Sequence, residues 1–386
     1  WNVTHVIECN NTAITLNGNL RISRELRFNN VHLMMNVTDM EAPPPYTIEV
    51  SGKGTFLVNA KDGLPSIIEN GLNKSAYYTF QARKGSRFEM RSSQLRNCGF
   101  AWNLPDFDWA GLWIATDGVI IENSLIEHNH FVGIFFYNSG NHKIYNNVIR
   151  SNDWYGIYGI NSPNNQINGN KITSNGLCGI SLSNAPNSII TKNVASSNGW
   201  DGIALSGAPD SVITGNTANS NGDDGIELSS SDRSLISTNT ANSNGDCGIV
   251  VSGSINTQIL KNTANSNNHG IYASSSPNII IADNTANSNR WTARHSTGIY
   301  VSSSQKAAIG PNVVTNNWRG IYLEYSSGAS ITNNIANNNT LFGIHLYSAP
   351  TNILSDNKVK FSTGEWDSAG IYLSFSSETQ LITNLV

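Results

Sequence analysis

The sequence predicts an all-β fold, a right-handed parallel β-helix in which about 22–23 residues form each rung of a solenoid. Three observations predict it. A Gly followed by an apolar residue recurs at this spacing, the residues after it alternate between apolar and polar, and an Asn closes a second short strand in register. Strands this short bury their apolar face only by stacking on equivalent strands one rung away.

The Gly repeat defines roughly 12 regular rungs. In a typical rung the first strand spans Gly202 to Leu205 and the second spans Val212 to Thr214. We therefore expect less regular β-helix rungs at residues 1–100 and regular repeats at residues 101–386. The Ile after each Gly should point inward, and the closing Asn side chains should bond to one another along the stack. The repeated glycines are Gly111, Gly133, Gly156, Gly179, Gly202, Gly225, Gly248, Gly270, Gly298, Gly320, Gly343 and Gly370.

Interruptions of the repeat predict loops. Two longer steps place side loops at residues 290–297 and 361–369, and each contains a tryptophan, Trp291 and Trp366. A run of prolines from Pro43 to Pro45 predicts a third loop in the N-terminal part.

Composition argues against several classes of function. With 13% charged residues and a net charge of −4, the chain lacks the basic footprint of a nucleic-acid-binding protein. It contains no apolar run of the roughly 18 residues that a membrane-spanning helix needs. Because it begins at Trp1, we expect an exported protein whose signal peptide has been removed. Five glycosylation sequons favour an extracellular or cell-surface location: Asn2, Asn10, Asn36, Asn73 and Asn338.

The four cysteines are too few for a disulfide framework, and their spacing suits no zinc site. We expect Cys9 and Cys98 to form a disulfide within the N-terminal part. Cys178 and Cys247 fall three repeats apart, roughly 14 Å at about 4.8 Å per strand step, which is beyond disulfide reach. They are either small buried residues or contacts to other chains.

Acidic residues gather just before the repeated Gly in consecutive rungs. Stacking would bring them into one carboxylate cluster with a histidine near its end: Asp201, Asp223, Asp224, Asp246 and His269. Crowded carboxylates raise one another's pKa values, as a general acid requires, and their spacing could suit an inverting glycosidase. The structural alternative is that Asp-Gly and Asn-Gly are good turn formers at a repeated corner.

A second column, formed by the outward residue after the inward Ile, is aromatic at both ends. Its rings could form a protein interface, stack on sugar rings, or simply stack on one another as good strand residues. His128 and His130 alternate on one strand, but no third metal ligand is evident, so we expect solvated turn histidines and no metal. The aromatic members of the column are Trp113, Phe135, Tyr158, Tyr272, Tyr300, Tyr322 and Tyr372.

Residues of about 95–386 resemble a known family. Units such as residues 239–245, Asn-Thr-Ala-Asn-Ser-Asn-Gly, followed by Gly248-Ile249, resemble right-handed parallel β-helix repeat proteins. That family includes NosD-like periplasmic proteins and carbohydrate-binding and sugar-hydrolase domains, and the units look most like archaeal, notably methanogen, surface proteins. The resemblance implies the fold, since this scaffold carries lyases, hydrolases, epimerases, adhesins and structural proteins.

The acidic cluster is similar in part to that of polygalacturonases. Asp201 and the pair Asp223-Asp224 match the first two elements of the polygalacturonase pattern. The next rung carries Asp246-Cys247 in place of Gly-His-Gly, His269 comes one rung late, and no Arg-x-Lys follows. These departures put hydrolase chemistry in doubt.

These observations favour a structural surface protein that self-assembles into a sheath, filament or surface layer. The last residues, 380–386, stop within a rung and show no capping helix, which favours contact with a further copy. The rival is a polysaccharide-binding or polysaccharide-cleaving β-helix centred on Asp201, Asp224 and His269. A NosD-like helper in metal-cofactor assembly is a third possibility, but the sequence has no His, Met or Cys cluster for it. We expect no cofactor, and partners that are further copies of the chain or a polysaccharide.

Overall fold

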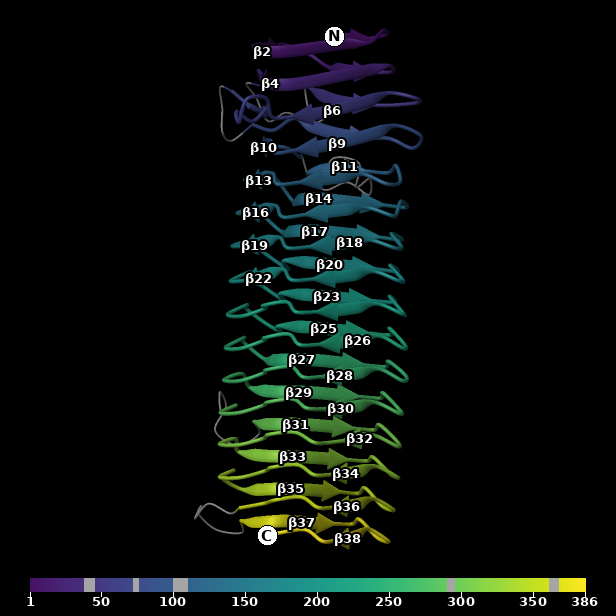
Figure 1. The fold of residues 1–386 in the computed structure, drawn as a ribbon, viewed down its shortest axis with the longest axis vertical. Helices are drawn as coiled ribbons and strands as arrows, with labels where there is room; N and C mark the ends of the chain where they lie inside the picture. The colour runs from purple at the N-terminus through teal and green to yellow at the C-terminus, as the bar shows by residue number, and fades with distance from the viewer. Residues whose placement is uncertain (38–45, 72–75, 100–109, 290–295, 361–367) are drawn as a thin grey trace. The chain divides into compact units, whose positions relative to one another are not determined.

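The computed structural model describes residues 1–37, 46–71, 76–99, 110–289, 296–360 and 368–386. These residues form short β-strands without a helix, in two compact units, Trp1–Gly199 (unit 1) and Trp200–Val386 (unit 2). Within each unit, strands of successive rungs pair in parallel, about 23 residues apart along the chain (Figure 1). The predicted all-β solenoid is therefore confirmed. The predicted loops at Pro43 to Pro45, Trp291 and Trp366 lie outside the described residues.

Unit 1 consists of three columns of parallel strands. Strand β4 connects two of them, because residues 25–29 pair with β6 and residues 32–35 pair with β7. One column contains β1 (Asn2–Val3), β3 (Leu20–Ile22), β5 (Thr47–Val50), β8 (Thr79–Ala82), β11 (Leu112–Ile114), β14 (Val132–Tyr137), β17 (Tyr155–Ile160) and β20 (Ile180–Ser183). The other two columns share their first two strands, β2 (Ile7–Leu16) and β4 (Glu25–Met35), which pair with each other along most of their length.

From β4 the two columns run separately. One contains β6 (Thr55–Asn59), β9 (Arg87–Arg91), β12 (Ile120–Glu122), β15 (Lys143–Tyr145), β18 (Gln166–Asn168) and β21 (Ile189–Thr191). The other contains β7 (Ile67–Asn70), β10 (Gln94–Arg96), β13 (Leu125–Glu127), β16 (Val148–Arg150), β19 (Lys171–Thr173) and β22 (Val194–Ser196).

Unit 2 has two columns of strands, and isolated bridges take the place of the third, from Thr217 to Leu385. The first column contains β23 (Ile203–Ser206), β25 (Ile226–Ser229), β27 (Cys247–Ser252), β29 (His269–Ser274), β31 (Thr297–Ser302), β33 (Arg319–Glu324), β35 (Phe342–Tyr347) and β37 (Ala369–Ser374). The second contains β24 (Val212–Thr214), β26 (Leu235–Ser237), β28 (Gln258–Leu260), β30 (Ile280–Ala282), β32 (Ala308–Ile309), β34 (Ser330–Thr332), β36 (Ile353–Ser355) and β38 (Gln380–Ile382).

The predicted Ile column forms the core. Ile134 and Ile157 of unit 1, like Ile203 and Ile226 of unit 2, are fully buried and face their equivalents on the next rung. Each such side chain contributes roughly 1.5–3 kcal/mol of burial free energy. The preceding Gly is required by close approach, because a Cβ on Gly225 would lie 2.6 Å from the carbonyl oxygen of Gly248.

The predicted Asn ladder is confirmed within each unit. In unit 2 the backbone N–H and the Nδ2 of Asn239 both donate to Oδ1 of Asn262, at 2.9 and 3.0 Å, and both residues are buried. A second ladder, not predicted, runs five residues later through Asn244 and Asn267. Both ladders satisfy backbone groups that the tight corners leave unpaired.

The predicted Cys9–Cys98 disulfide is wrong, because both thiols are free. Cys9 is in register with Phe28, and Phe28 with Val58, which in turn faces Met90 of the rung that ends near Cys98. Three strand steps of about 4.8 Å separate the two cysteines by roughly 14 Å, beyond disulfide reach. The described residues also contain no helix long and apolar enough to cross a membrane.

Candidate functional site

A ladder of alternating charge crosses four rungs of unit 1. Pairing of β7 with β10 and of β10 with β13 places Arg96 between Glu69 and Glu127 on one face. Arg96 lies 3.6 Å from the Glu69 carboxylate and 2.8 Å from that of Glu127, and Arg150 on the following rung lies 2.8 Å from Glu127. The Glu127 side chain is only 7% exposed. Two guanidinium groups therefore hold this carboxylate in a fixed position.

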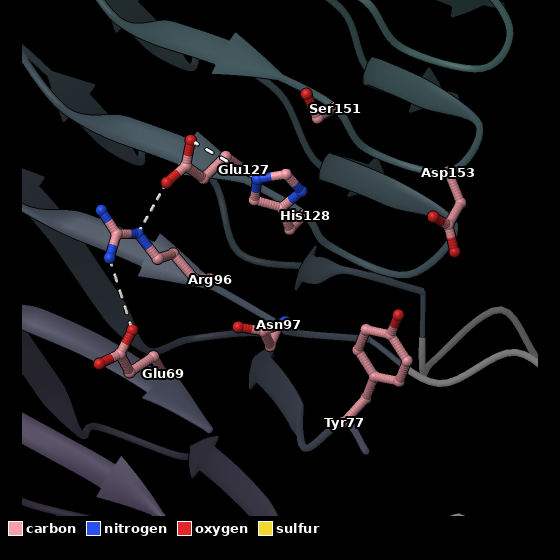
Figure 2. A pocket seen from close by; sticks show the side chains of 8 residues that line it. All are labelled: Glu69, Tyr77, Arg96, Asn97, Glu127, His128, Ser151 and Asp153. Carbon is pink, nitrogen blue, oxygen red and sulfur yellow. Dashed lines mark ion pairs between the residues drawn. The ribbon is translucent and has the colours of Figure 1, made fainter. Parts of the chain in front are cut away.

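A pocket of about 650 Å³ opens beside this ladder (Figure 2). Polar groups dominate its walls, to which Tyr77 adds a phenol ring. His128 lies at its edge with a side chain 59% exposed and in the left-handed backbone region (φ 54°). The lining residues are Glu69, Tyr77, Arg96, Asn97, Glu127, His128, Ser151 and Asp153.

His130 supports the pocket wall. Its Nδ1 contacts the Asp153 carboxylate, and its ring lies 4.9 Å from the ring of Tyr77. Burial, and then the charge of Asp153, raises the pKa of Tyr77, so that this hydroxyl keeps its proton and remains a donor. The expectation of a solvated turn residue fits His128 and is wrong for His130, whose side chain is 26% exposed and contacts the Asp153 carboxylate.

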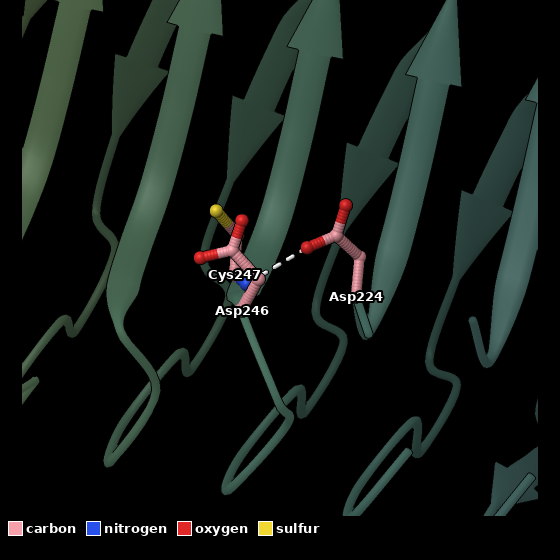
Figure 3. Close-up of side chains that lie close together, drawn as sticks. All are labelled: Asp224, Asp246 and Cys247. Atoms are coloured by element: carbon pink, nitrogen blue, oxygen red, sulfur yellow. Dashed lines mark hydrogen bonds between the residues drawn. The ribbon is translucent and has the colours of Figure 1, made fainter. Parts of the chain in front are cut away.

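The acidic cluster predicted in unit 2 forms in part. Oxygen and sulfur atoms of Asp224, Asp246 and Cys247 lie within 4.8 Å of one another (Figure 3). Asp201 accepts a hydrogen bond from the backbone N–H of Asp224 (3.0 Å), and Asp224 accepts one from the N–H of Cys247 (2.7 Å). Both carboxylates thus accept a hydrogen bond from the backbone of the next rung.

The electrostatics of this cluster are unusual. Burial raises the pKa of Asp224 to about 8; the backbone N–H of Cys247 lowers it, and the nearby carboxylates of Asp201, Asp223 and Asp246 raise it further. Burial, followed by other carboxylates, also raises the pKa values of Asp223 and Glu227. The Asp224 carboxyl is therefore protonated at neutral pH.

Cys247 is the third member of this cluster. Burial and the adjacent carboxylates raise the pKa of its thiol well above the usual value, so without a cation the thiol keeps its proton. The Asp246 carboxylate accepts a hydrogen bond from Nδ2 of Asn268 at 2.8 Å. His269 follows on the next rung in register with Cys247, as expected at the end of the cluster, and its ring centroid lies 6.2 and 5.7 Å from those of Tyr272 and Tyr300.

The predicted aromatic column is present but its rings stack on one another. Ring centroids are 4.8 Å apart for Tyr272 and Tyr300, 4.9 Å for Tyr300 and Tyr322, and 4.7 Å for Tyr322 and His345. In this arrangement the ring faces are covered by neighbouring rings, as the third interpretation expected. Tyr372, at 43% exposure, is the open member of this stretch.

An open aromatic stripe is the wrong description for several members. Trp113, Phe135 and Tyr322 are only 5%, 0% and 9% exposed. In unit 1 the ring of Phe135 stacks on that of Tyr158 at 5.3 Å and packs with Trp113 in a small apolar cluster. A binding role for the column remains a prediction.

The sequons differ in accessibility. Asn2, Asn10 and Asn338 are exposed, whereas Asn36 is half-buried and donates through Nδ2 to Asn17. Asn73 lies outside the described residues. Glycosylation stays a prediction for all five.

Sequence reasoning missed the pocket of unit 1. Its residues come from rungs whose spacing is irregular, so no single period aligns Glu69, Arg96 and Glu127. The alternation of charge at successive strand ends was the available signal.

The sequence matches the models of two known protein families. The model of the right-handed β-helix region matches residues 12–188, 86–240 and 132–286. The chain belongs to this right-handed β-helix family. Residues 254–386 also match the model of the periplasmic copper-binding protein NosD. A comparison with curated protein sequences gives no significant match.

Solved structures of low identity are also similar to the chain. The periplasmic alginate epimerase AlgG is 14% identical over 97% of this chain and 76% of its own, with a TM-score of 0.46. The A-module of the mannuronan C-5 epimerase AlgE6 from Azotobacter vinelandii is 13% identical over 93% and 91%, with a TM-score of 0.48. Tailspike protein 3 of bacteriophage CBA120 is 12% identical over 94% and 56%, with a TM-score of 0.43. At these TM-scores the likeness supports no statement about this chain. The matched NosD model carries the word periplasmic in its name, a compartment outside the cytoplasm.

Proposed function

We propose that this chain is a saccharide-binding β-helix protein that acts outside the cytoplasm, and that the pocket of unit 1 holds a sugar unit. The observation that carries the proposal is the 650 Å³ pocket with one tyrosine and seven polar or charged lining residues. A cavity of this size accommodates a small ligand, and polar walls favour one rich in hydroxyl groups.

The lining matches the hydrogen-bonding needs of a sugar. Carboxylates and the amide of Asn97 accept from or donate to hydroxyl groups, and the ring of Tyr77 offers an apolar surface for sugar C–H groups. The fixed ion pairs of Arg96 hold these groups in place before the ligand arrives, which reduces the entropy lost on binding.

The same contacts favour binding over cleavage. Two guanidinium groups, each 2.8 Å away, already engage the Glu127 carboxylate, so it serves as a fixed part of the pocket wall and not as a group free to approach a substrate bond. Glu69 is likewise held, by Arg96 and by a 2.8 Å contact with His32.

Native gel electrophoresis through a panel of soluble polysaccharides tests the proposal. We expect one or more polymers to retard the wild-type protein, and Tyr77→Ala to weaken this binding about tenfold, or roughly 1.4 kcal/mol. Tyr145→Ala is the matched control, since Tyr145 is a half-buried tyrosine of unit 1 that does not line the pocket. Equal retardation of wild type and Tyr77→Ala would refute the site.

Polysaccharide cleavage is the second candidate, supported by the protonated Asp224 carboxyl near Asp201 and Asp223. Release of reducing ends or unsaturated products from an acidic polysaccharide, abolished in Asp224→Asn, would establish it.

Self-assembly into a sheath, filament or surface layer stays a prediction. Light scattering at micromolar concentration tests it, because a monomeric particle would count against it.

A further inference from the structure

One corner of unit 2 requires a left-handed backbone in each of its eight rungs. The residue that follows the first strand of the rung has φ between 47° and 59°. A left-handed φ is least favourable for a bulky side chain. Six rungs place a small residue there, and two place an aromatic one, in the order Gly207, Ser230, Gly253, Ser275, Ser303, Tyr325, Ser348 and Phe375.

The two aromatic residues gain little burial in return. Tyr325 is 53% exposed and Phe375 is 79% exposed. Tyr347, from the rung between them, meets Tyr325 at 5.8 Å and 74° and meets Phe375 at 5.8 Å and 90°. We call these three residues the aromatic corner. Bulky residues that are both strained and exposed are unfavourable for folding, so their presence points to function.

The aromatic corner differs from the stacked column in what it offers a ligand. In the column, rings such as Tyr300 lie between two others at 4.8 and 4.9 Å, so both faces are covered. In the corner the rings meet edge to face, and more than half of Tyr325 and of Phe375 is open to solvent. Open ring faces are therefore available for contact.

We propose that the aromatic corner is a platform on which an uncharged saccharide stacks. Two residues beyond Tyr325 and beyond Phe375 lies a serine that is not buried, Ser327 (half-buried) and Ser377 (exposed), which suits sugar hydroxyl groups. Three rings also offer far less than the roughly 800 Å² per partner of a stable protein interface.

The negative net charge of unit 2 disfavours binding of an acidic polymer at this platform. Residues 200–386 contain 8 Lys and Arg against 13 Asp and Glu, a net charge of −5. Glu324, the neighbour of Tyr325, accepts a hydrogen bond from the Tyr300 hydroxyl and adds a negative charge at the corner. An anionic polysaccharide would be repelled, whereas a neutral one would not.

The inference rests on the proposed function only for its ligand class, because the aromatic corner and the pocket lie in different units. A set of variants separates them: wild type, Tyr77→Ala, the double variant Tyr325→Ser with Phe375→Ser, and all three changes together. Serine is the residue of four equivalent corners, so the double variant should fold at least as stably as wild type.

The probes are neutral polymers, namely hydroxyethyl cellulose, xyloglucan and galactomannan, with polygalacturonate as the acidic comparison. We expect the double variant to bind a neutral polymer about tenfold more weakly, in wild-type and Tyr77→Ala backgrounds alike, with an unchanged or higher Tm. Ile280→Ser, which removes a side chain 39% exposed on β30, should bind as wild type does.

Three results would overturn the inference: unchanged binding in the double variant, no retardation of wild type by any neutral polymer, or loss of self-association with saccharide binding intact. Loss of binding in Tyr77→Ala alone would leave the pocket as the saccharide site and refute the corner. Loss in the double variant alone would refute the pocket and retain the corner.

Discussion

The raised pKa of Asp224 makes a pH-dependent prediction for stability. In the unfolded chain this carboxyl has a pKa near 3.8, and in the folded protein the value is about 8. Between these values the folded state retains a proton that the unfolded state has lost, so the free energy of unfolding falls as pH rises. From pH 5 to pH 8 this one group should lower it by about 3 to 4 kcal/mol.

Asp224→Asn removes the titrating group but keeps an oxygen that can accept from the N–H of Cys247. We expect the variant to be more stable than wild type at pH 8, with an advantage that shrinks toward pH 5. The difference between the two proteins cancels the contributions of His142 and His345, whose pKa values burial lowers.

Urea unfolding at pH 5, 6.5 and 8, with m-values compared, measures this difference. Asp210→Asn is the control: it removes an exposed carboxyl paired with Arg233 and should leave the fall between pH 5 and pH 8 in place. If the difference between wild type and Asp224→Asn changes by less than about 1 kcal/mol over this range, the assignment of a buried, protonated Asp224 is refuted.

Three further predictions concern the body of the solenoid. Asn262→Ala should lower the free energy of unfolding by roughly 2–4 kcal/mol, because Asn239 loses its acceptor and the Ile236 carbonyl loses a donor. In the same urea assay, the control Gln258→Ala should change the free energy of unfolding by less than about 0.5 kcal/mol. His345→Phe should raise it at pH 7 by roughly 1 kcal/mol, since both ring nitrogens are buried without a partner; a clear loss of stability would contradict this. Native alkylation followed by peptide mass spectrometry should label the partly exposed Cys9 before Cys98, and a peptide linked through both would contradict the free thiols.

The regular part of the fold could be predicted because stacking forces one environment on each repeat position. Ile203 and Ile226 are buried for the same reason that they recur, and Asn239 and Asn262 recur because each accepts a hydrogen bond from the backbone N–H of the equivalent Asn on the preceding rung. A period in the sequence therefore records the core and the ladder directly.

Orientation and cross-rung pairing were not predictable in this way. The outward direction of Tyr300 follows from alternation, but whether its faces meet other rings depends on side-chain rotamers. The pocket depends on Glu69 and Glu127 facing Arg96 across rungs of unequal length, so its residues share no common interval. Tyr325 and Phe375 could have been noticed as exceptions to a corner that otherwise holds Gly or Ser.

The Asn ladder of unit 2 also gives its axis a direction. The side-chain amide of each buried Asn donates to the Oδ1 of the next, from Asn216 through Asn312 to Asn384, and never in reverse along this row. Aligned amide dipoles polarise one another, so the row carries a net dipole along the stack of unit 2, with the donated amide N–H pointing in each case toward the Asn of higher residue number. A row with this polarity can be continued only by a group that keeps the same direction of donation.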